Sequence, residues 1–271
     1  MKKIILFFGA VVALYSCRFN IPSEVVEGIA SALLEETPVQ AEGLMELPAG
    51  APGDNIITHT GYTISYNTTT LIPNWVAYEL TAEEASGDED RGERTFSMDP
   101  DFKKYQARRE DYSGSGWTKG HMAPAGDFRW DEEAMDETFY LTNVCPQNER
   151  LNAKDWNYLE KKVRGWARDF GKVWVVTGPI VGDNLYGKIG ERSVTVPDSF
   201  FKAVLSVSKG KYRAIAFVMG NDSDRYYLKD CAMSVNDLEE LTGLDFFPML
   251  DDSIEESTEE GFSLSYWHIN N

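Results

Sequence analysis

The chain has 271 residues, of which 42% are hydrophobic and 13% aromatic. These proportions exclude a largely disordered protein and predict one large packed core rather than two small domains. The net charge of −18 disfavours binding of polyanions over the whole surface, although basic residues gather between residues 103 and 164.

Residues 1–17 resemble the signal segment of a bacterial lipoprotein. Lys2 and Lys3 precede an apolar stretch that is too short to span a bilayer comfortably, and this stretch ends just before Cys17. The pattern predicts cleavage before Cys17 and lipidation of its thiol. The mature protein would then be attached to a bacterial membrane, at the outer membrane or the cell surface. The alternative is an ordinary secretory signal with a chance cysteine, which also places the protein outside the cytoplasm.

Residues 18–55 are expected to form an acidic tether, which closes with a segment rich in proline, alanine and glycine at 48–53. The domain is then expected to comprise residues 56–271. Alternating polar and apolar residues predict its first two strands, at 62–66 and 75–80.

A glycine-rich loop follows at residues 113–116, and a buried strand is expected at 138–142. Apolar residues spaced three or four apart then predict a long helix that begins near Leu151 and ends at Gly171. The remaining elements are expected as four strands and a last helix, at residues 173–177, 194–196, 200–207, 212–219 and 235–241. Strands before and after a central helix, without regular βαβ alternation, predict a single α+β domain with a mixed antiparallel sheet and packed helices.

His121 lies in a segment whose residue types suit proton transfer. Gly120 lets the backbone turn closely behind the imidazole, and Lys119 supplies a cation next to it. A histidine beside a glycine is usually structural, so this segment alone indicates little. The residues downstream, which include Asn143, Asn152 and Glu160, give it weight.

Taken together, these motifs resemble the DNA/RNA non-specific endonuclease family, the ββα-metal nucleases. The resemblance extends over roughly residues 62–250 and rests on Thr118-Lys119-Gly120-His121, Asn143-Val144-Cys145-Pro146-Gln147, Asn152 and Trp156-Asn157-Tyr158-Leu159-Glu160. It implies a ββα-metal active-site motif within the α+β domain. It also implies an enzyme that uses Mg²⁺, or alternatively Mn²⁺, to hydrolyse the phosphodiester bonds of DNA and RNA.

The residues of these motifs suit distinct roles in such a reaction. His121 is expected to act as the general base that takes a proton from the attacking water. Asn152 would bind the cation through its side-chain carbonyl, and Glu160, about two helical turns further on, would reach the ion's water shell. Arg94 would hold the phosphate with its planar guanidinium. By the family resemblance, Asn143 supports the metal and His121 side of the site.

Each of these polar residues also has a structural interpretation. Asn143 suits a turn and Asn152 suits a helix N-cap, two roles that asparagine often fills. Arg94 and Glu160 suit solvated surface charges. The functional interpretation is favoured because the four residues occur together with His121.

One departure from the family pattern concerns the two residues before Gly120. The usual Asp-Arg pair is Thr118-Lys119 here, and lysine lacks the two-pronged guanidinium of arginine, so its phosphate contact should weaken. Lys119→Arg is therefore expected to cleave faster. The departure keeps open a catalytically impaired relative that binds nucleic acid or a protein partner. A surface lipoprotein that uses the scaffold for adhesion is a further alternative.

Two cysteines remain beyond the signal segment, Cys145 and Cys231. An isolated pair outside the cytoplasm is a candidate disulfide, which would pin the active-site loop to the C-terminal part of the domain. Two buried free thiols are the alternative. The pair has no neighbouring histidine or cysteine at ligand spacing, so it is a poor zinc site.

Overall fold

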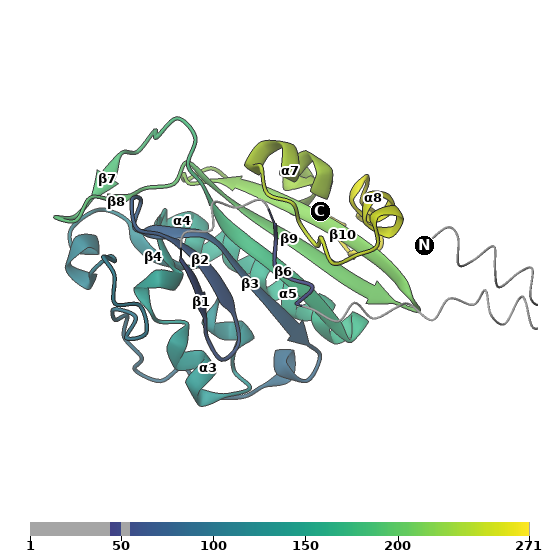
Figure 1. The fold of residues 1–271 in the computed structure, drawn as a ribbon, viewed down its shortest axis with the longest axis horizontal. Helices are drawn as coiled ribbons and strands as arrows, with labels where there is room; N and C mark the ends of the chain where they lie inside the picture. Colours follow the sequence, from purple (N-terminus) through teal and green to yellow (C-terminus); the bar gives the residue numbers. More distant parts are fainter. Residues whose placement is uncertain (1–43, 50–54, 271) are drawn as a thin grey trace, which may run out of the picture. The chain divides into compact units, whose positions relative to one another are not determined.

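The computed structural model describes residues 44–49 and 55–270. Cys17, the expected signal segment and most of the expected tether lie outside these residues. The described domain contains a seven-stranded sheet with helices packed on both of its faces (Figure 1). All of its strand pairs are antiparallel, so the expected α+β domain with an antiparallel sheet is confirmed. None of the helices in the described ranges is long and apolar enough to cross a membrane.

The strands of the sheet follow one another with a single large insertion. Their order across the sheet is β1 (Ile56–Thr58), β2 (Thr63–Asn67), β3 (Ile72–Thr81), β6 (Lys172–Ile180), β9 (Ser199–Ser208), β10 (Lys211–Gly220) and β11 (Ala232–Met233). The chain between β3 and β6 leaves the sheet and builds the candidate active site. A small hairpin of β7 (Lys188–Ile189) and β8 (Val194–Thr195) lies in the connection between β6 and β9.

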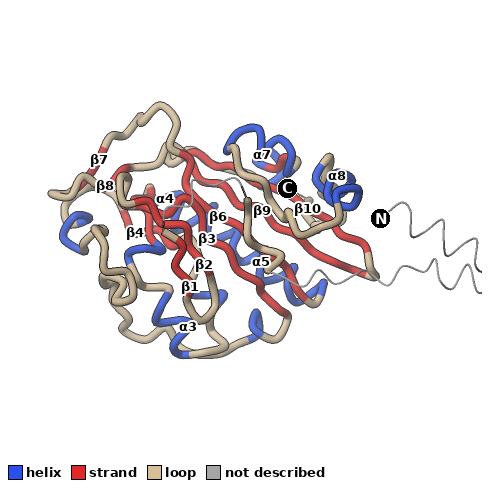
Figure 2. Tube along the Cα trace, in the orientation of Figure 1, coloured by secondary structure: helices blue, strands red, loops and turns tan. Residues whose placement is uncertain are grey.

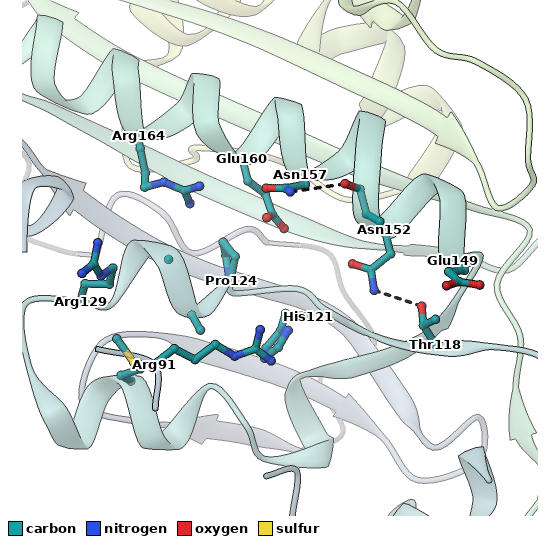
Figure 3. Close-up of a pocket in the computed structure, with 14 residues that line it drawn as sticks. Arg91, Thr118, His121, Pro124, Arg129, Glu149, Asn152, Asn157, Glu160 and Arg164 are labelled. Atoms are coloured by element: carbon teal, nitrogen blue, oxygen red, sulfur yellow. Dashed lines mark hydrogen bonds between the residues drawn. The ribbon is translucent and has the colours of Figure 1, made fainter. Parts of the chain in front are cut away.

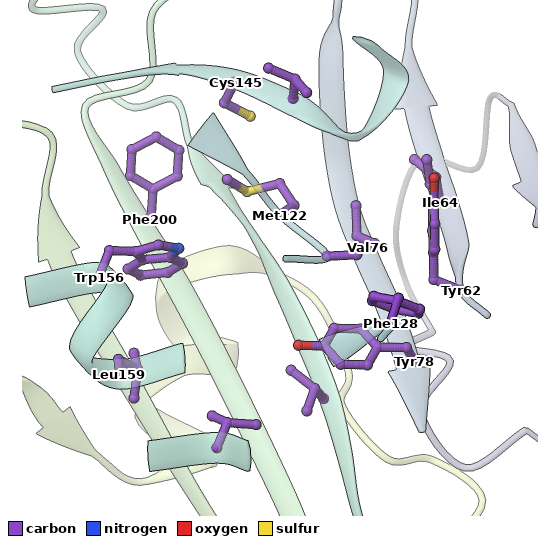
Figure 4. Packing of buried hydrophobic residues seen from close by; sticks show 14 of the residues in the cluster. Tyr62, Ile64, Val76, Tyr78, Met122, Phe128, Cys145, Trp156, Leu159 and Phe200 are labelled. Carbon is purple, nitrogen blue, oxygen red and sulfur yellow. The ribbon is translucent and has the colours of Figure 1, made fainter. Parts of the chain in front are cut away.

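Side chains alternate between the two faces of the sheet, as expected for strands that are covered on both sides. Val76 and Tyr78 of β3 belong to the cluster beneath helix α5 (Asn157–Phe170), whereas Trp75 and Ala77 belong to the cluster beneath helix α7 (Val235–Thr242). Figure 4 shows the first cluster, in which strand and helix side chains interlock. Full burial of one large apolar side chain stabilises the fold by about 1.5–3 kcal/mol.

The long helix matches its expected end but has a more complex beginning. It comprises α4 (Glu149–Leu151), a π-helical turn η5 (Asn152–Trp156) and α5, and it stops at Gly171, whose φ of 94° suits glycine. Asn148 caps its start by accepting hydrogen bonds from the next turn. The expected N-cap, Asn152, therefore lies inside the helix instead.

Two other expectations about secondary structure are wrong. Residues 138–142 form turns and the start of the short helix η4 (Leu141–Asn143), because the backbone donors of residues 138–140 bond to carbonyls three residues back. Their strand-like pairing is limited to an isolated parallel bridge between Tyr140 and Ser97. Helix α7 is also followed by a further helix, α8 (Asp252–Glu259). Its sequence is largely acidic, so it carries little apolar periodicity. Figure 2 shows α7 and α8 together beside β10.

The expected boundary between tether and domain is too late in the chain. Met45 is buried in the cluster beneath α7, and Ala49 pairs with Asp245 through two backbone hydrogen bonds. Residues 44–49 thus pack as part of the domain.

Cys145 and Cys231 do not form the expected disulfide, because both thiols are free. Cys145 is fully buried in the cluster beneath α5, close to Tyr66 and Tyr112. Cys231 is half-buried at the end of helix α6 (Leu228–Cys231), near Asp155. The two side chains thus have different neighbours, and burial raises the pKa of each thiol above its ordinary value.

Candidate active site

The insertion between β3 and β6 folds into two short antiparallel strands followed by the long helix. Strand β4 (Thr118–His121) pairs with β5 (Val144–Gln147), and α4 begins just after β5. A cavity of about 390 Å³ lies between β4 and the helix (Figure 3). It is lined by Arg91, Thr118, His121, Pro124, Ala125, Gly126, Arg129, Met135, Glu149, Asn152, Ala153, Asn157, Glu160 and Arg164.

His121 ends β4, and its imidazole lines the cavity. Its ring packs against Phe96 and Phe139, with ring centres 4.9 and 5.0 Å away, and its buried Nε2 has no hydrogen-bond partner. Burial, and secondarily the charge of Arg91, lower the pKa of His121 to about 3. The imidazole is therefore neutral at physiological pH, while the same shift makes it a weaker base than a free imidazole.

Gly120 is required by the close approach of β5. A Cβ atom at this position would lie 2.2 Å from Oε1 of Gln147, which is buried. Any side chain at Gly120 would force β4 and β5 apart and move His121, so the Gly-His pair has a packing reason.

Asn143 holds the backbone that follows His121. Its amide donates to the carbonyls of Ala123 and Thr138 at 2.9 Å each and accepts a bond from the Ala123 N–H at 2.9 Å. The side chain is fully buried and directed at backbone groups. The expected support of the His121 side therefore has a geometric basis, whereas these contacts leave no evident role for Asn143 at a metal.

Asn152 lies across the cavity from His121, where its amide donates to the hydroxyl of Thr118 at 3.0 Å (Figure 3). The π-helical turn that it begins has wider spacing than an α-helix, which brings side chains five residues apart closer to one face. Asn152 and Asn157 both line the cavity as a result, and Glu160 and Arg164 follow on the next turns.

Glu160 and Arg164 line the cavity and belong to a partly buried group of charges. Burial raises the pKa of Glu160, while the nearby ammonium of Lys202 opposes this shift. Lys202 is fully buried and its Nζ lacks a hydrogen-bond partner, so burial lowers its pKa in turn. Arg164 is paired with Asp127, which also accepts a 2.7 Å bond from the hydroxyl of Tyr78.

Arg164 was missed in the sequence although it lies one helical turn after Glu160, a spacing that predicts a shared face. The Gly126 backbone makes room for it, since a Cβ at Gly126 would lie 2.8 Å from its Nη1. Arg129 also lines the cavity, and its guanidinium is held by the carbonyls of Asp88 and Glu89 at 2.8 Å.

The structure places Arg94, the arginine expected at the phosphate, outside the cavity. Arg94 is absent from the cavity lining, because its guanidinium pairs with Asp136 and, at 3.4 Å, with Glu89. It also donates to the Arg91 carbonyl at 3.0 Å and thereby braces that residue. Arg91, three residues before Arg94, does line the cavity, and its charge acts on His121.

Lys119 flanks the site without lining the cavity. Its ammonium lies 5.2 Å from the ring centre of Tyr112 and 5.8 Å from that of Phe96, the ring that also packs on His121. Burial, and then the charge of Arg109, lower its pKa. These contacts do not support the expected direct role of Lys119 at the scissile phosphate.

The other two histidines have unrelated surroundings. His59 is buried between Asp99, 3.1 Å from its Nε2, and Glu137, 3.5 Å from its Nδ1. His268 is exposed and lies 3.6 Å from Asp169. His121 is thus the one histidine of the three that faces the cavity.

The donors of this cavity suit a divalent cation that is coordinated mostly by water and by few protein atoms. Within the described ranges, no group of three or more His, Cys, Asp or Glu side chains is arranged to hold a metal ion. Magnesium keeps most of its waters and takes few protein oxygens, which matches one amide oxygen from Asn152 with the Glu160 carboxylate nearby. The imidazole of His121 lines the same cavity, which leaves room for a water or a substrate between it and these groups.

Two antiparallel strands and a helix, with an imidazole on the first strand and an amide and a carboxylate on the helix, define a ββα-metal nuclease site. Residues 41–253 match the model of the DNA/RNA non-specific endonuclease family, and the chain belongs to that family.

Relatives with known names support this membership. The human mitochondrial nuclease EXOG is 39% identical over 71% of this chain and 57% of its own length. Human mitochondrial endonuclease G is 36% identical, over 73% of this chain and 72% of its own length. A crystal structure of the EndoG/EndoGI complex matches with a TM-score of 0.68 and 32% identity, over 74% of this chain and 89% of that one. The chain spans 57–64% of the length of the nuclease EXOG relatives.

Proposed function

We propose that this protein is a metal-dependent endonuclease that hydrolyses phosphodiester bonds in DNA and RNA, with His121 as the general base. The observation that carries the proposal is the pairing of a buried, neutral imidazole with an amide and a carboxylate across one cavity. Membership of the DNA/RNA non-specific endonuclease family supports both the reaction and the breadth of substrates.

The cavity residues divide the work of phosphodiester hydrolysis. The imidazole of His121 accepts a proton from water as the water oxygen bonds to phosphorus, and the bond from phosphorus to the 3′ oxygen breaks. The 3′ oxygen takes a proton from a second water, so the products are a 5′-phosphate and a 3′-hydroxyl. Arg91 and Arg164 lie where a phosphate entering the cavity would meet them. The negative phosphate also offsets the positive charge of Arg91, which favours the protonated imidazole as the reaction proceeds.

We assign Mg²⁺ as the cation, with Mn²⁺ as a substitute, and Asn152 and Glu160 as the residues that hold it and its surroundings. A bound divalent cation neutralises charge on the phosphate and stabilises the departing oxygen. An uncharged amide ligand repels an incoming polyanion less than a carboxylate would, which suits a chain with a net charge of −18.

The purified domain incubated with supercoiled plasmid and with a structured RNA provides the test. We expect both polymers to be degraded in Mg²⁺ or Mn²⁺ and neither in excess EDTA. Undiminished cleavage in chelator would contradict the metal mechanism. Binding of nucleic acid without cleavage in any divalent cation would instead support the alternative of an impaired, nucleic-acid-binding relative.

We further propose that Cys17 carries a lipid that anchors the protein to a bacterial membrane outside the cytoplasm. The support is the sequence of residues 1–17 alone, in which a basic start and an apolar stretch lead directly to the cysteine. Incorporation of labelled palmitate into the wild-type protein, and its loss in Cys17→Ser, would support this assignment. Equal labelling of both proteins would contradict it.

A further inference from the structure

We propose that Thr118 is a positioning residue that determines which atom of the Asn152 amide faces the cavity. The inference rests on the proposed function, since it concerns the oxygen that would bind the cation. It also gives a role to Thr118, which the sequence presented only as a departure from the family pattern.

The hydroxyl of Thr118 has two partners with different requirements. Its Oγ1 lies 2.8 Å from the backbone carbonyl of Gln147 and 3.0 Å from Nδ2 of Asn152. A carbonyl can only accept a hydrogen bond, and a hydroxyl has one proton to donate. The proton therefore points at Gln147, and the hydroxyl oxygen is left to accept a bond from Asn152.

This arrangement allows one orientation of the amide. A reversed Asn152 would place its Oδ1 against the Thr118 oxygen with no proton between them, which leaves two acceptors facing each other. In the observed orientation Nδ2 is bonded to Thr118 and Oδ1 points away from it into the cavity (Figure 3).

The hydroxyl itself is held in place by the strand pairing. Thr118 lies opposite Gln147 in the β4–β5 register, so the acceptor of its proton belongs to the paired strand. Threonine is also restricted in χ1 by its branched Cβ. The orientation of Asn152 is thereby linked to the backbone that positions His121.

The test compares Thr118→Val, which removes the hydroxyl at similar volume, with Thr118→Ser, which keeps it. Binding of Mn²⁺ to the purified domain without nucleic acid is measured by the loss of the free Mn²⁺ signal in electron paramagnetic resonance. We expect Thr118→Val to bind Mn²⁺ about 10–100-fold more weakly, the range for partners that orient a metal ligand, and Thr118→Ser to bind within about threefold of wild type.

A double-mutant cycle separates positioning from general damage. Asn152→Asp replaces the amide with a carboxylate whose two oxygens are equivalent, so its orientation no longer matters. In that background Thr118→Val should change Mn²⁺ affinity by less than about threefold. An equal loss in both backgrounds would overturn the inference, because it would show that the hydroxyl acts on folding or packing. Melting temperatures are measured for all variants, and Thr118→Ala replaces valine if the latter fails to fold.

Failure of the inference differs from failure of the proposed function. Wild-type protein that binds no Mn²⁺, alone or with a short oligonucleotide, would overturn both. Wild-type binding that Thr118→Val leaves unchanged would overturn only the positioning role and leave the metal-dependent mechanism intact.

Discussion

The two faces of the seven-stranded sheet each hold a carboxylate with a raised pKa, but cations lie beside the carboxylate on only one of these faces. On the cavity face, Glu160 has Lys202 and Arg164 nearby. On the other face, Glu259 of α8 is buried near Glu239 and Glu255, and its Oε1 has no hydrogen-bond partner. Burial raises the pKa of both groups, and like charges raise that of Glu259 further, to about 9.

The difference indicates which face is suited to chemistry on a polyanion. A carboxylate near cations can stay ionised beside a bound metal, and the arginines beside it attract phosphate. A cluster of carboxylates instead repels phosphate and affects mainly the stability of the fold. We expect substitutions on the cavity face to change activity more than stability, and substitutions around Glu259 to do the reverse.

Four sets of substitutions test this contrast between the cavity face and the face around Glu259. The largest effect is expected for Asn152→Ala. Loss of the amide oxygen should lower the cleavage rate by at least about 100-fold, because a bound cation supplies several kcal/mol of charge stabilisation. Raising Mg²⁺ should restore part of the activity, since the phosphate and Glu160 remain. Initial rates on plasmid DNA across a range of Mg²⁺ concentrations measure both effects. A loss that no concentration of Mg²⁺ relieves would argue against a ligand role.

Arg91→Ala and Arg94→Ala form a matched pair on one segment. Arg91 lines the cavity, so its loss should lower kcat/KM by about 10- to 100-fold, the equivalent of one hydrogen bond to a charged group. Arg94 pairs with Asp136 and Glu89 near the surface, so its loss should cost less than about fivefold. Steady-state kinetics on one short duplex at fixed salt compares them. A larger loss of kcat/KM in Arg94→Ala than in Arg91→Ala would indicate that Arg94 contacts the phosphate.

Glu259→Gln should stabilise the protein in a pH-dependent way. The folded pKa of about 9 exceeds the ordinary value of 4.5, so the folded state holds more protons between these values and stability falls as pH rises through them. Glutamine keeps the neutral shape, so the variant should melt roughly 2–4 °C higher at pH 8, the shift from about 1 kcal/mol, and like wild type at pH 4.

The exposed Glu256 on the same helix provides the control for that experiment. Glu256→Gln makes the same chemical change without relieving the buried cluster, and it should leave the melting temperature nearly unchanged at both pH values. A pH-independent gain in Glu259→Gln would show that charge repulsion is not its cause.

The smallest effect is expected for Lys119→Arg. Lys119 contacts the rings of Tyr112 and Phe96 outside the cavity, and such contacts are worth about 0.5–1 kcal/mol at exposed sites. We expect a gain of no more than about threefold in kcat/KM on duplex DNA at matched salt. A gain above tenfold would place this side chain at the phosphate after all.

The spacing of apolar residues predicted those helices and strands that bury one face along their whole length. The apolar spacing from Trp156 to Phe170 and the stop at Gly171 correspond to the observed helix, because one face of it packs on the sheet. Helix α8 was missed since its contact with the sheet depends on few apolar side chains, such as Ile254. The π-helical turn at Asn152 corresponds to the spacing of five residues between the buried Leu151 and Trp156, which was not recognised in the sequence.

The site residues whose role follows from their residue type could be predicted from the sequence. Those whose role depends on ion-pair partners far away in the chain could not. His121, Asn152 and Glu160 lie together as expected. Two arginines three residues apart look alike in a sequence, and only the positions of Asp136 and Glu89 show that Arg94 is occupied. The disulfide expectation failed for a similar reason, because two cysteines in one domain need not share neighbours.

The central claim is that the imidazole of His121, which lines the cavity, accepts the proton of the attacking water. Single-turnover cleavage of a short duplex by wild type and His121→Ala, in Mn²⁺ and at equal melting temperature, tests it most directly. We predict a loss on the order of 10²–10⁴-fold with unchanged binding of the duplex. Cleavage by His121→Ala at the wild-type rate would contradict the account.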